Sequence, residues 1–384
     1  MNTDHLETPL TANVYKTTAA KLAHENLRIP GPVPLPDDIL EAVGTQMMNH
    51  RGPEYADMLA RMTADLKTVF MTKGDAYFIT SSGTGAMETA IVNTLSPGDK
   101  VLSLTIGFFG DRFADIAKAY GAQVESMSFP YGKPVDPDAL GKKLRESKGV
   151  KAVILTHNES STGVSNPLQA IAHAVHANSD ALVLVDAVSS AAAMPIAVDA
   201  WGLDVVATAA QKAWIAPPGI AMVTFSQKAW KAQETAKMPR YYFDMVQYRD
   251  YLKIGQPPFT PCLPAMYALE ISLRRIVEEG IENVFARHHA IADRTRNGAI
   301  KLGLTLFPDR QFASNTVTAI RLPEGLDGKA LVAKVRKDSG IVIGGGQGPM
   351  TGKIVRIGHM GWVEPAHVDA ALDAVGKAIN GMRP

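Results

Sequence analysis

Three groups that could do chemistry together each follow a short apolar run of the sequence. Lys212 lies in TAAQKAWIAPPG among small and apolar residues, whereas lysine is normally on the surface with its ammonium in water. Asp186 directly follows the run ALVLV. The run AYFIT is followed, where a helical pattern begins, by Ser82, Gly83 and Thr84. A lysine, a carboxylate and such a helix start can bind an aldehyde, a cationic nitrogen and a phosphate, respectively.

Taken singly, each group has an ordinary structural interpretation. A lysine can lay its stem on apolar surface with its charge in water, and serine, threonine or aspartate often caps a helix. Together they match pyridoxal 5′-phosphate (PLP), which needs an anchored phosphate, an anion against its ring nitrogen and a lysine that forms a Schiff base. The Ser-Gly-Thr run lacks the ending of a P-loop and the third glycine of a dinucleotide-binding loop. The residues therefore predict a PLP site.

The pattern of apolar runs predicts how the chain brings these groups together. Near-continuous apolar runs alternate with stretches that have the apolar spacing of helices. Such a pattern indicates an α/β fold with a mostly parallel sheet covered by helices on both faces, whose ligands bind beyond the carboxyl ends of the strands. The predicted strands are 76–80, 100–105, 123–129, 150–156, 181–186, 203–209 and 219–226.

The chain after this pattern predicts a smaller second domain. Residues 263–303 have the pattern of one or two long helices, and shorter strands and helices follow. We expect an N-terminal arm over 1–25, a large PLP-binding domain over 26–262, and a small C-terminal α+β domain over 263–384 that includes the long linking helix. The proline-rich segment 28–38 is expected to be an ordered loop.

Composition excludes several classes of partner. The chain has 384 residues, and its 39 basic and 38 acidic side chains give a net charge of +1, so nucleic acid and membrane surfaces are not expected as partners. The single cysteine, Cys262, excludes an internal disulfide and fits a reducing compartment. The adjacent His288 and His289 lack a partner four residues away, so no metal site is expected. With no signal-peptide core and no long apolar run, we expect a cytoplasmic protein.

Seven motifs, in order, resemble the class-V aminotransferases among the fold-type-I PLP enzymes, of the alanine–glyoxylate and serine–glyoxylate (serine–pyruvate) kind. They cover nearly the whole chain after the first 25 or so residues. The resemblance implies the fold of those transferases, a mostly parallel sheet between helices with a smaller C-terminal α+β domain. The motifs are IPGPVPLPDDILEAVGTQMMNHRGPEY, SSGTGAMETAIVN, GFFGDRFADIA, THNESSTGVSNPL, LVLVDAVSS, AAQKAWIAPPGIA and IVRIGHMG.

The resemblance assigns roles to the residues that match its motifs. It implies that Lys212 holds PLP and then moves a proton between the substrate's α-carbon and C4′ of the cofactor. It implies that Asp186 pairs with the protonated ring nitrogen and that Phe109 stacks on the ring, where many relatives have tryptophan. The residues that the resemblance places at the cofactor phosphate are Ser82, Gly83, Thr84 and Gln211; Thr84 stands where the family has histidine.

The resemblance also implies a substrate site and a partner subunit. Arg356 matches the arginine that binds the substrate's α-carboxylate, a planar contact for which guanidinium is suited. Ser160 is expected beside the ring, and Gly31 in the loop that lines the substrate pocket. Thr260 matches a residue that reaches the phosphate of the neighbouring subunit, which implies a homodimer with shared sites. A tyrosine that some members have upstream of that threonine is replaced here, near Gln256.

The resemblance predicts an aminotransferase that moves the amino group of alanine or serine to an oxo acid, with glyoxylate expected, in two half-reactions. One alternative is another class-V reaction, such as phosphoserine transamination or a desulfurase or lyase reaction. Two features argue against sulfur chemistry: Gln211 stands where desulfurases usually have histidine, and Cys262 lies beside the predicted phosphate site. The sequence does not exclude phosphoserine transamination. A second alternative is a catalytically silent binding protein, which would be expected to have lost Lys212, Asp186 or Arg356.

Overall fold

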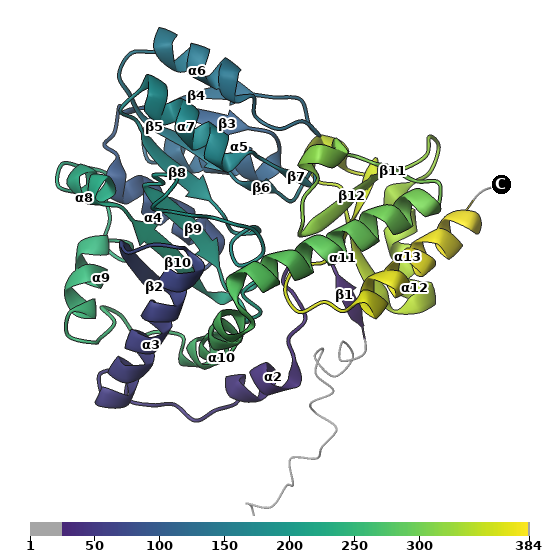
Figure 1. Cartoon of the computed structure of the whole chain (residues 1–384), viewed down its shortest axis with the longest axis horizontal. Helices are drawn as coiled ribbons and strands as arrows, with labels where there is room; N and C mark the ends of the chain where they lie inside the picture. The colour runs from purple at the N-terminus through teal and green to yellow at the C-terminus, as the bar shows by residue number, and fades with distance from the viewer. Residues whose placement is uncertain (1–24, 383–384) are drawn as a thin grey trace, which may run out of the picture.

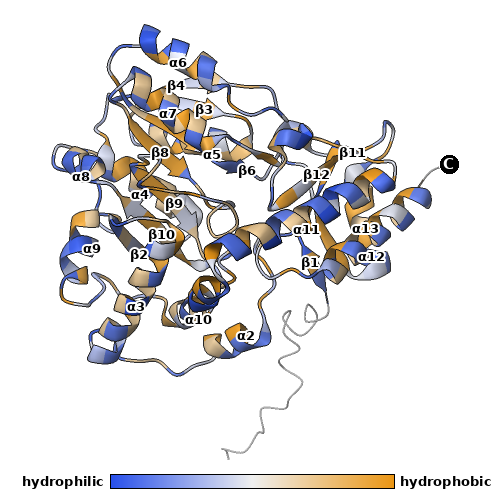
Figure 2. Ribbon diagram, viewed as in Figure 1, coloured by the Kyte–Doolittle hydropathy of each residue, from blue (hydrophilic) through white to orange (hydrophobic). Residues whose placement is uncertain are grey.

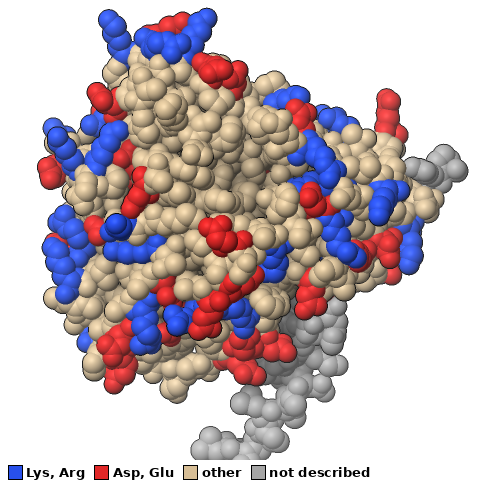
Figure 3. Space-filling view, in the orientation of Figure 1, with Lys and Arg blue, Asp and Glu red and all other residues tan. Residues whose placement is uncertain are grey.

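The computed structural model describes residues 25–382, in which a larger and a smaller sheet each carry their own helices (Figure 1). The predicted arm, 1–25, lies outside the described residues except for Glu25. Among residues 25–382, no helix is both long and apolar enough to cross a membrane. On the face drawn in Figure 3, basic and acidic side chains are interspersed.

The larger sheet has seven strands in the order β2-β10-β9-β8-β5-β3-β4. Neighbours pair in parallel except at β10, which is antiparallel to β2 and β9. The prediction of a mostly parallel α/β sheet is confirmed, and each predicted strand forms close to its expected bounds. In chain order the strands are β2 (Asp75–Ser81), β3 (Lys100–Thr105), β4 (Gln123–Ser128), β5 (Val150–Thr156), β8 (Leu182–Asp186), β9 (Val205–Ala209) and β10 (Gly219–Phe225).

Helices cover both faces of this sheet because its strands are apolar on both sides. Successive side chains of a strand point to opposite faces, so in β8 Val183 and Val185 join one core while Leu182 and Leu184 join the other. Figure 2 shows the resulting hydrophobic centre between the helical layers. The first core includes α3 (Pro53–Val69), α6 (Pro137–Glu146), α7 (Leu168–Asn178) and α10 (Leu263–Glu279); the second includes α4 (Gly83–Thr94), α5 (Phe108–Ala119), α8 (Gln227–Gln233) and α9 (Met245–Leu252).

The smaller sheet has the order β1-β13-β14-β12-β11 and packs against three helices. The predicted helical stretch 263–303 forms two helices, α10 and α11, which meet at Gly280. Strands β1 and β11 were not predicted, because both are too short for a periodic pattern; β1 pairs in parallel with β13, and β11 pairs antiparallel with β12. The elements are β1 (Asn26–Arg28), α11 (Ile281–Lys301), β11 (Thr305–Leu306), β12 (Val317–Arg321), α12 (Gly328–Ser339), β13 (Ile341–Gly345), β14 (Ile354–Gly358) and α13 (Pro365–Asn380).

The segment between β1 and α3 is ordered, as its prolines predict. Its backbone is tied to the chain next to Lys212, because Val33 N donates to the Gln211 carbonyl oxygen at 3.1 Å. The remaining short elements are α2 (Asp37–Val43), β6 (Asn158–Glu159), β7 (Val164–Ser165) and the 3-10 turns η1 (Arg310–Phe312) and η2 (Gly348–Met350).

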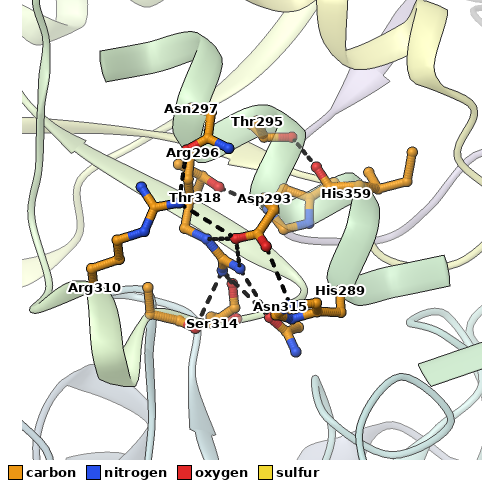
Figure 4. Close-up of polar contacts among 12 residues, drawn as sticks. His289, Asp293, Thr295, Arg296, Asn297, Arg310, Ser314, Asn315, Thr318 and His359 are labelled. Atoms are coloured by element: carbon orange, nitrogen blue, oxygen red, sulfur yellow. Dashed lines mark hydrogen bonds and ion pairs between the residues drawn. The ribbon is translucent and has the colours of Figure 1, made fainter. Parts of the chain in front are cut away.

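A buried arginine ties helix α11 to the loop before β12 (Figure 4). Arg296 is 4% exposed, and its guanidinium donates to the Ser314 carbonyl oxygen at 2.8 Å and to Asp293 Oδ1 at 2.9 Å. Thr316, at the end of the same loop, accepts a hydrogen bond from Asn158 Nδ2 at 2.9 Å. The smaller sheet is therefore anchored to the polar segment that follows β5.

Candidate active site

A cavity lies where several strands of the larger sheet end. Its wall comes from the residues after β2, β5 and β9, from the end of β8 and from the start of α5. The parallel topology explains this convergence, because strands that run in the same direction end at the same edge. The predicted site residues that line the cavity are Ser82, Gly83, Thr84, Phe109, Ser160, Asp186, Gln211 and Lys212.

The remaining predicted residues lie around this cavity or away from it. Arg356 contacts its wall through a hydrogen bond to the Ser160 carbonyl oxygen, and Gly31 lies against Lys212. Thr260 does not line the cavity and is exposed on this chain.

The amine of Lys212 lies in a confined, partly apolar space. Its Nζ donates to the Pro30 carbonyl oxygen, and a Cβ on Gly31 would come within 2.6 Å of that nitrogen. Gly31 also has a φ of 95°, which favours glycine. Burial lowers the pKa of Lys212 from 10.5 to about 8, although Asp186 acts in the opposite direction. About a tenth of the amine is therefore neutral at pH 7 and about half at pH 8, and this neutral form is the one that a nucleophile or base requires.

The carboxylate of Asp186 is held at the end of β8 and is 3% exposed. Val188 N donates to its Oδ1 at 2.9 Å, and Thr156 Oγ1 donates to its Oδ2 at 3.0 Å. Each oxygen therefore has capacity for a further hydrogen bond, and Asp186 lines the cavity. Burial raises the pKa of Asp186, so a cationic ligand that pairs with it would stabilise its charged form.

The first turn of α4 offers donors without internal partners. Its N-cap, Ser82, makes no side-chain capping bond, and the first backbone N–H groups of a helix have no carbonyl to bind. Gln211 lines the same cavity, and the NH2 group of its side-chain amide can donate to an anion. An uncapped helix start and an amide donor on one cavity wall fit a phosphate group.

Arg356 is a buried cation that makes no ion pair within residues 25–382. It is 6% exposed on β14, and its Nε donates to the Gly345 carbonyl oxygen at 2.8 Å. Its Nη1 donates to the Ser160 carbonyl oxygen, also at 2.8 Å. Burial lowers its pKa to about 10, so the guanidinium stays charged at neutral pH. A buried charge held only by neutral acceptors fits an anionic ligand.

Sequence reasoning missed the residue that positions Phe109. Glu159 is fully buried, and its Oε2 accepts hydrogen bonds from Phe109 N at 2.9 Å and Gly110 N at 3.1 Å. The N-cap of α5 is Gly107, which has no side chain to cap the helix, so Glu159 takes that role from another strand. The signal in the sequence was weak: a helix pattern that starts at glycine and a carboxylate after the strand 150–156.

Sequence reasoning also missed Arg112, a second cation on the cavity wall. Its Cζ lies 5.0 Å and 5.1 Å from the ring centroids of Phe108 and Phe109. It makes no hydrogen bond or ion pair with the described part of the chain, so its charge is available to a ligand. The sequence could have indicated Arg112 by its spacing: it follows Phe109 by three residues, so both side chains lie on the same face of a helix.

Replacing Gly107 with alanine is expected to destabilise the fold. The new Cβ would lie 2.6 Å from both Glu159 Cγ and Ser161 Oγ, and overpacking of this kind costs about 1–3 kcal/mol. Urea unfolding of the two proteins measures the change. Gly44→Ala is the control, because its Cβ would meet only the Glu41 carbonyl oxygen at 3.4 Å, and we expect a change within about 0.5 kcal/mol. Equal stability of the two variants would contradict the tight contact.

The cavity as a whole fits PLP. It brings together an uncapped helix start for the phosphate, a buried carboxylate with free lone pairs for the ring nitrogen, and an amine of lowered pKa for the aldehyde. Phe109 supplies an aromatic face on the same wall. These groups are the ones that the predicted cofactor needs for its phosphate, ring nitrogen, aldehyde and ring face.

Comparisons with known proteins agree with this site. The family model described as Aminotransferase class-V matches residues 39–361. A protein of Synechococcus sp. (strain PCC 6716) named soluble hydrogenase, small subunit, is 40% identical over 351 residues, 91% of each chain. The L-aspartate–glyoxylate aminotransferase of Paracoccus denitrificans is 39% identical over 338 residues, 87% of this chain and 85% of that protein.

A solved structure is similar over the whole fold. The crystal structure of alanine–glyoxylate aminotransferase from Nostoc sp. superposes with a TM-score of 0.89 at 30% identity, covering 92% of this chain and 95% of that one. The family match and the geometry together identify an aminotransferase that uses PLP and acts on amino acids and oxo acids. This chain belongs to the class-V aminotransferase family.

Proposed function

We propose that this aminotransferase moves the amino group of a small amino acid, alanine or serine, to glyoxylate. The observation that carries the proposal is Arg356, a buried cation without an ion pair that is hydrogen-bonded to the cavity wall at Ser160. A guanidinium in that position suits the α-carboxylate that every amino acid and oxo acid substrate presents. Glyoxylate as acceptor is supported by the names of the Paracoccus and Nostoc relatives.

In this proposal, each residue does its work at a stated atom. Arg356 binds the α-carboxylate and thereby orients the substrate's α-carbon. Lys212 Nζ is neutral in part because its pKa is about 8, so it can take the proton from that carbon. It then gives the proton back later in the same half-reaction. When bound, PLP supplies a carbonyl that accepts the amino group and a ring that withdraws electrons from the α-carbon. Asp186 holds the proton on the ring nitrogen and keeps the ring electron-poor.

The other predicted residues would hold the cofactor in place. Ser160 would lie beside the ring, Phe109 would stack on it, and Gly31 would leave room for the substrate next to Lys212. The residues proposed for the phosphate are Ser82, Gly83, Thr84 and Gln211. Thr260 is exposed and off the cavity, which supports a role at the phosphate of a second copy of the chain in a homodimer.

A second candidate donor is a dicarboxylic amino acid such as aspartate. Arg112 lines the cavity without a hydrogen bond or ion pair to residues 25–382, and a second carboxylate would give its charge a partner. The name of the Paracoccus relative supports this candidate. Alanine and serine would leave Arg112 without an anionic partner from the donor.

One experiment tests the function and separates the donors. The holoenzyme is mixed with alanine, serine or aspartate, loss of the cofactor absorbance is followed, and glyoxylate, pyruvate or 2-oxoglutarate is added to restore it. We expect conversion by at least one donor and recovery with glyoxylate. If none of the amino acids converts the cofactor, the proposed function is wrong.

The variant Arg112→Gln then decides between the donor classes. If aspartate is the donor, its kcat/KM should fall about 10- to 100-fold, the value of a charge-assisted hydrogen bond, while that for alanine changes little. Lys231→Ala, which removes an exposed cation on α8, is the control and should leave both donors unaffected. An equal loss for both donors would contradict a role of Arg112 at the donor's side chain.

A further inference from the structure

Three of the five N–H groups of the substrate arginine are engaged by the protein itself. A guanidinium has five N–H groups. In Arg356, the Nε hydrogen goes to the Gly345 carbonyl oxygen, and Nη1 donates both to the Ser160 carbonyl oxygen and, at 3.0 Å, to Gln347 Oε1. Only Nη2 has no partner among residues 25–382. A carboxylate that binds with two parallel hydrogen bonds needs Nη2 and one neighbouring donor, so one of the present partners has to leave.

The three partners differ in their freedom to leave. Gly345 ends strand β13, and Ser160 is 3% exposed in the segment after β6, so both carbonyl oxygens are fixed by the backbone. Gln347 is half-buried in the loop between β13 and β14, and it reaches Arg356 with a flexible side chain. Its hydrogen bond is also between a charged and a neutral group, which a carboxylate can outcompete.

We propose that Gln347 is an exchangeable partner of Arg356, which occupies the carboxylate position in the resting enzyme and gives way when the substrate's α-carboxylate binds. The inference rests on the proposed role of Arg356 as the carboxylate site. Gln347 keeps the buried guanidinium hydrogen-bonded when no substrate is present, since an unsatisfied buried charge is costly. It thereby sets the affinity for carboxylates of both donor and acceptor, because both bind at the same arginine.

The proposed exchange also explains why two acceptors of the glycine-rich run 343–348 contact Arg356. The glycine-rich run 343–348, IGGGQG, carries the Gly345 carbonyl oxygen to Nε and Gln347 Oε1 to Nη1 of one guanidinium. The first contact is made by backbone and the second by a side chain. The loop therefore fixes one edge of Arg356 and leaves the other to be exchanged.

The test compares two substitutions with opposite expected effects on binding to the holoenzyme. In Gln347→Glu, a carboxylate within the protein pairs with Arg356, so the Kd for propionate and the KM for the amino donor should both rise about 30- to 100-fold at low salt. In Gln347→Leu, the competitor is absent, so the Kd for propionate should fall by about tenfold or more, the value of a hydrogen bond to a charged group. Propionate is the probe because it has the size of alanine and no amine to react. Calorimetric titration gives the Kd, and steady-state kinetics give KM and kcat, of which we expect kcat to change less.

Each other outcome counts against the proposal. A Gln347→Leu variant that binds propionate more than tenfold more weakly would make Gln347 a permanent part of the site, and an unchanged Kd in Gln347→Glu would mean that Gln347 does not occupy the carboxylate position. Arg356→Leu separates this failure from that of the proposed function: if it binds propionate as the unaltered enzyme does, Arg356 is not the carboxylate site at all. The cofactor absorbance and the thermal midpoint of each variant show that it is folded and loaded.

Discussion

Lys212→Ala is expected to abolish transamination without unfolding the protein. The alanine cannot form a covalent link to the cofactor, and it leaves no base at the position of Nζ, which faces Pro30 and the cavity. Loss of a general base alone lowers rates about 10²- to 10⁴-fold, and loss of the covalent step adds to it. Turnover of the amino donor with glyoxylate measures the loss.

Borohydride reduction followed by mass spectrometry gives a second readout for the same substitution. The unaltered protein should carry a reduced adduct on the peptide that contains Lys212, and the variant should carry none. Lys231→Ala, with an exposed lysine on α8, should keep both the adduct and the activity. An adduct that persists in Lys212→Ala would show that a different lysine holds the cofactor.

The same lysine predicts a pH dependence. Because burial lowers its pKa from 10.5 to about 8, the neutral amine should increase as the pH rises through 8. Uptake of PLP by the apoenzyme should therefore accelerate over this range and level off above it, whereas a solvated lysine would still be accelerating near pH 10. Stopped-flow absorbance at several pH values measures the midpoint.

Asp186→Asn is expected to give the second-largest loss of activity, about 10²- to 10³-fold in kcat, the usual effect of removing one preorganised electrostatic contact. A neutral amide cannot stabilise a proton on the ring nitrogen of the cofactor. The amide also has one acceptor oxygen in place of two: if its Oδ1 keeps the hydrogen bond from Val188 N, its Nδ2 faces Thr156 Oγ1, and that hydroxyl has to accept instead of donate. We expect KM to change less than kcat, because the substrate carboxylate binds at Arg356.

A matched control lies at the other end of the same sheet. Asp204 is also 3% exposed and also accepts one backbone and one hydroxyl hydrogen bond, from Val183 N at 2.9 Å and Ser226 Oγ at 2.6 Å. Asp204→Asn should lower stability to a similar degree but leave kcat of the folded enzyme unchanged. If both variants lose kcat equally, the effect of Asp186→Asn comes from disturbed packing and the assignment to the ring nitrogen is wrong.

Much of the fold and part of the site could be predicted from local patterns. The strands of the larger sheet are apolar on both faces, so each appears in the sequence as a continuous run bounded by polar residues. Parallel strands end at one edge, so Asp186, Lys212 and Ser82 could be placed in one site from their positions after those runs. Neither step needed a contact between particular side chains.

The residues that sequence reasoning missed depend on such contacts. Glu159 caps α5 from a strand 50 positions along the chain, and Gln347 meets Arg356 across the turn between β13 and β14. Strand β1 was missed for a related reason, because its three residues gain their conformation only by pairing with β13. A single polar residue in a loop belongs to no periodic pattern, so the sequence does not show which group of another segment it contacts.

Local sequence thus specified the elements and the edge of the sheet where the chemistry lies, because hydrophobic periodicity and strand direction are properties of each segment and of its order in the chain. Only the folded chain decided how the site is tuned. Burial lowers the pKa of Lys212, Glu159 holds Phe109 in place, and Gln347 competes for Arg356. The first two effects depend on segments far apart in the sequence, and the third on the turn between β13 and β14, which separates Gln347 from Arg356 by nine positions. The packing of the two sheets and their helices sets the distances between these groups.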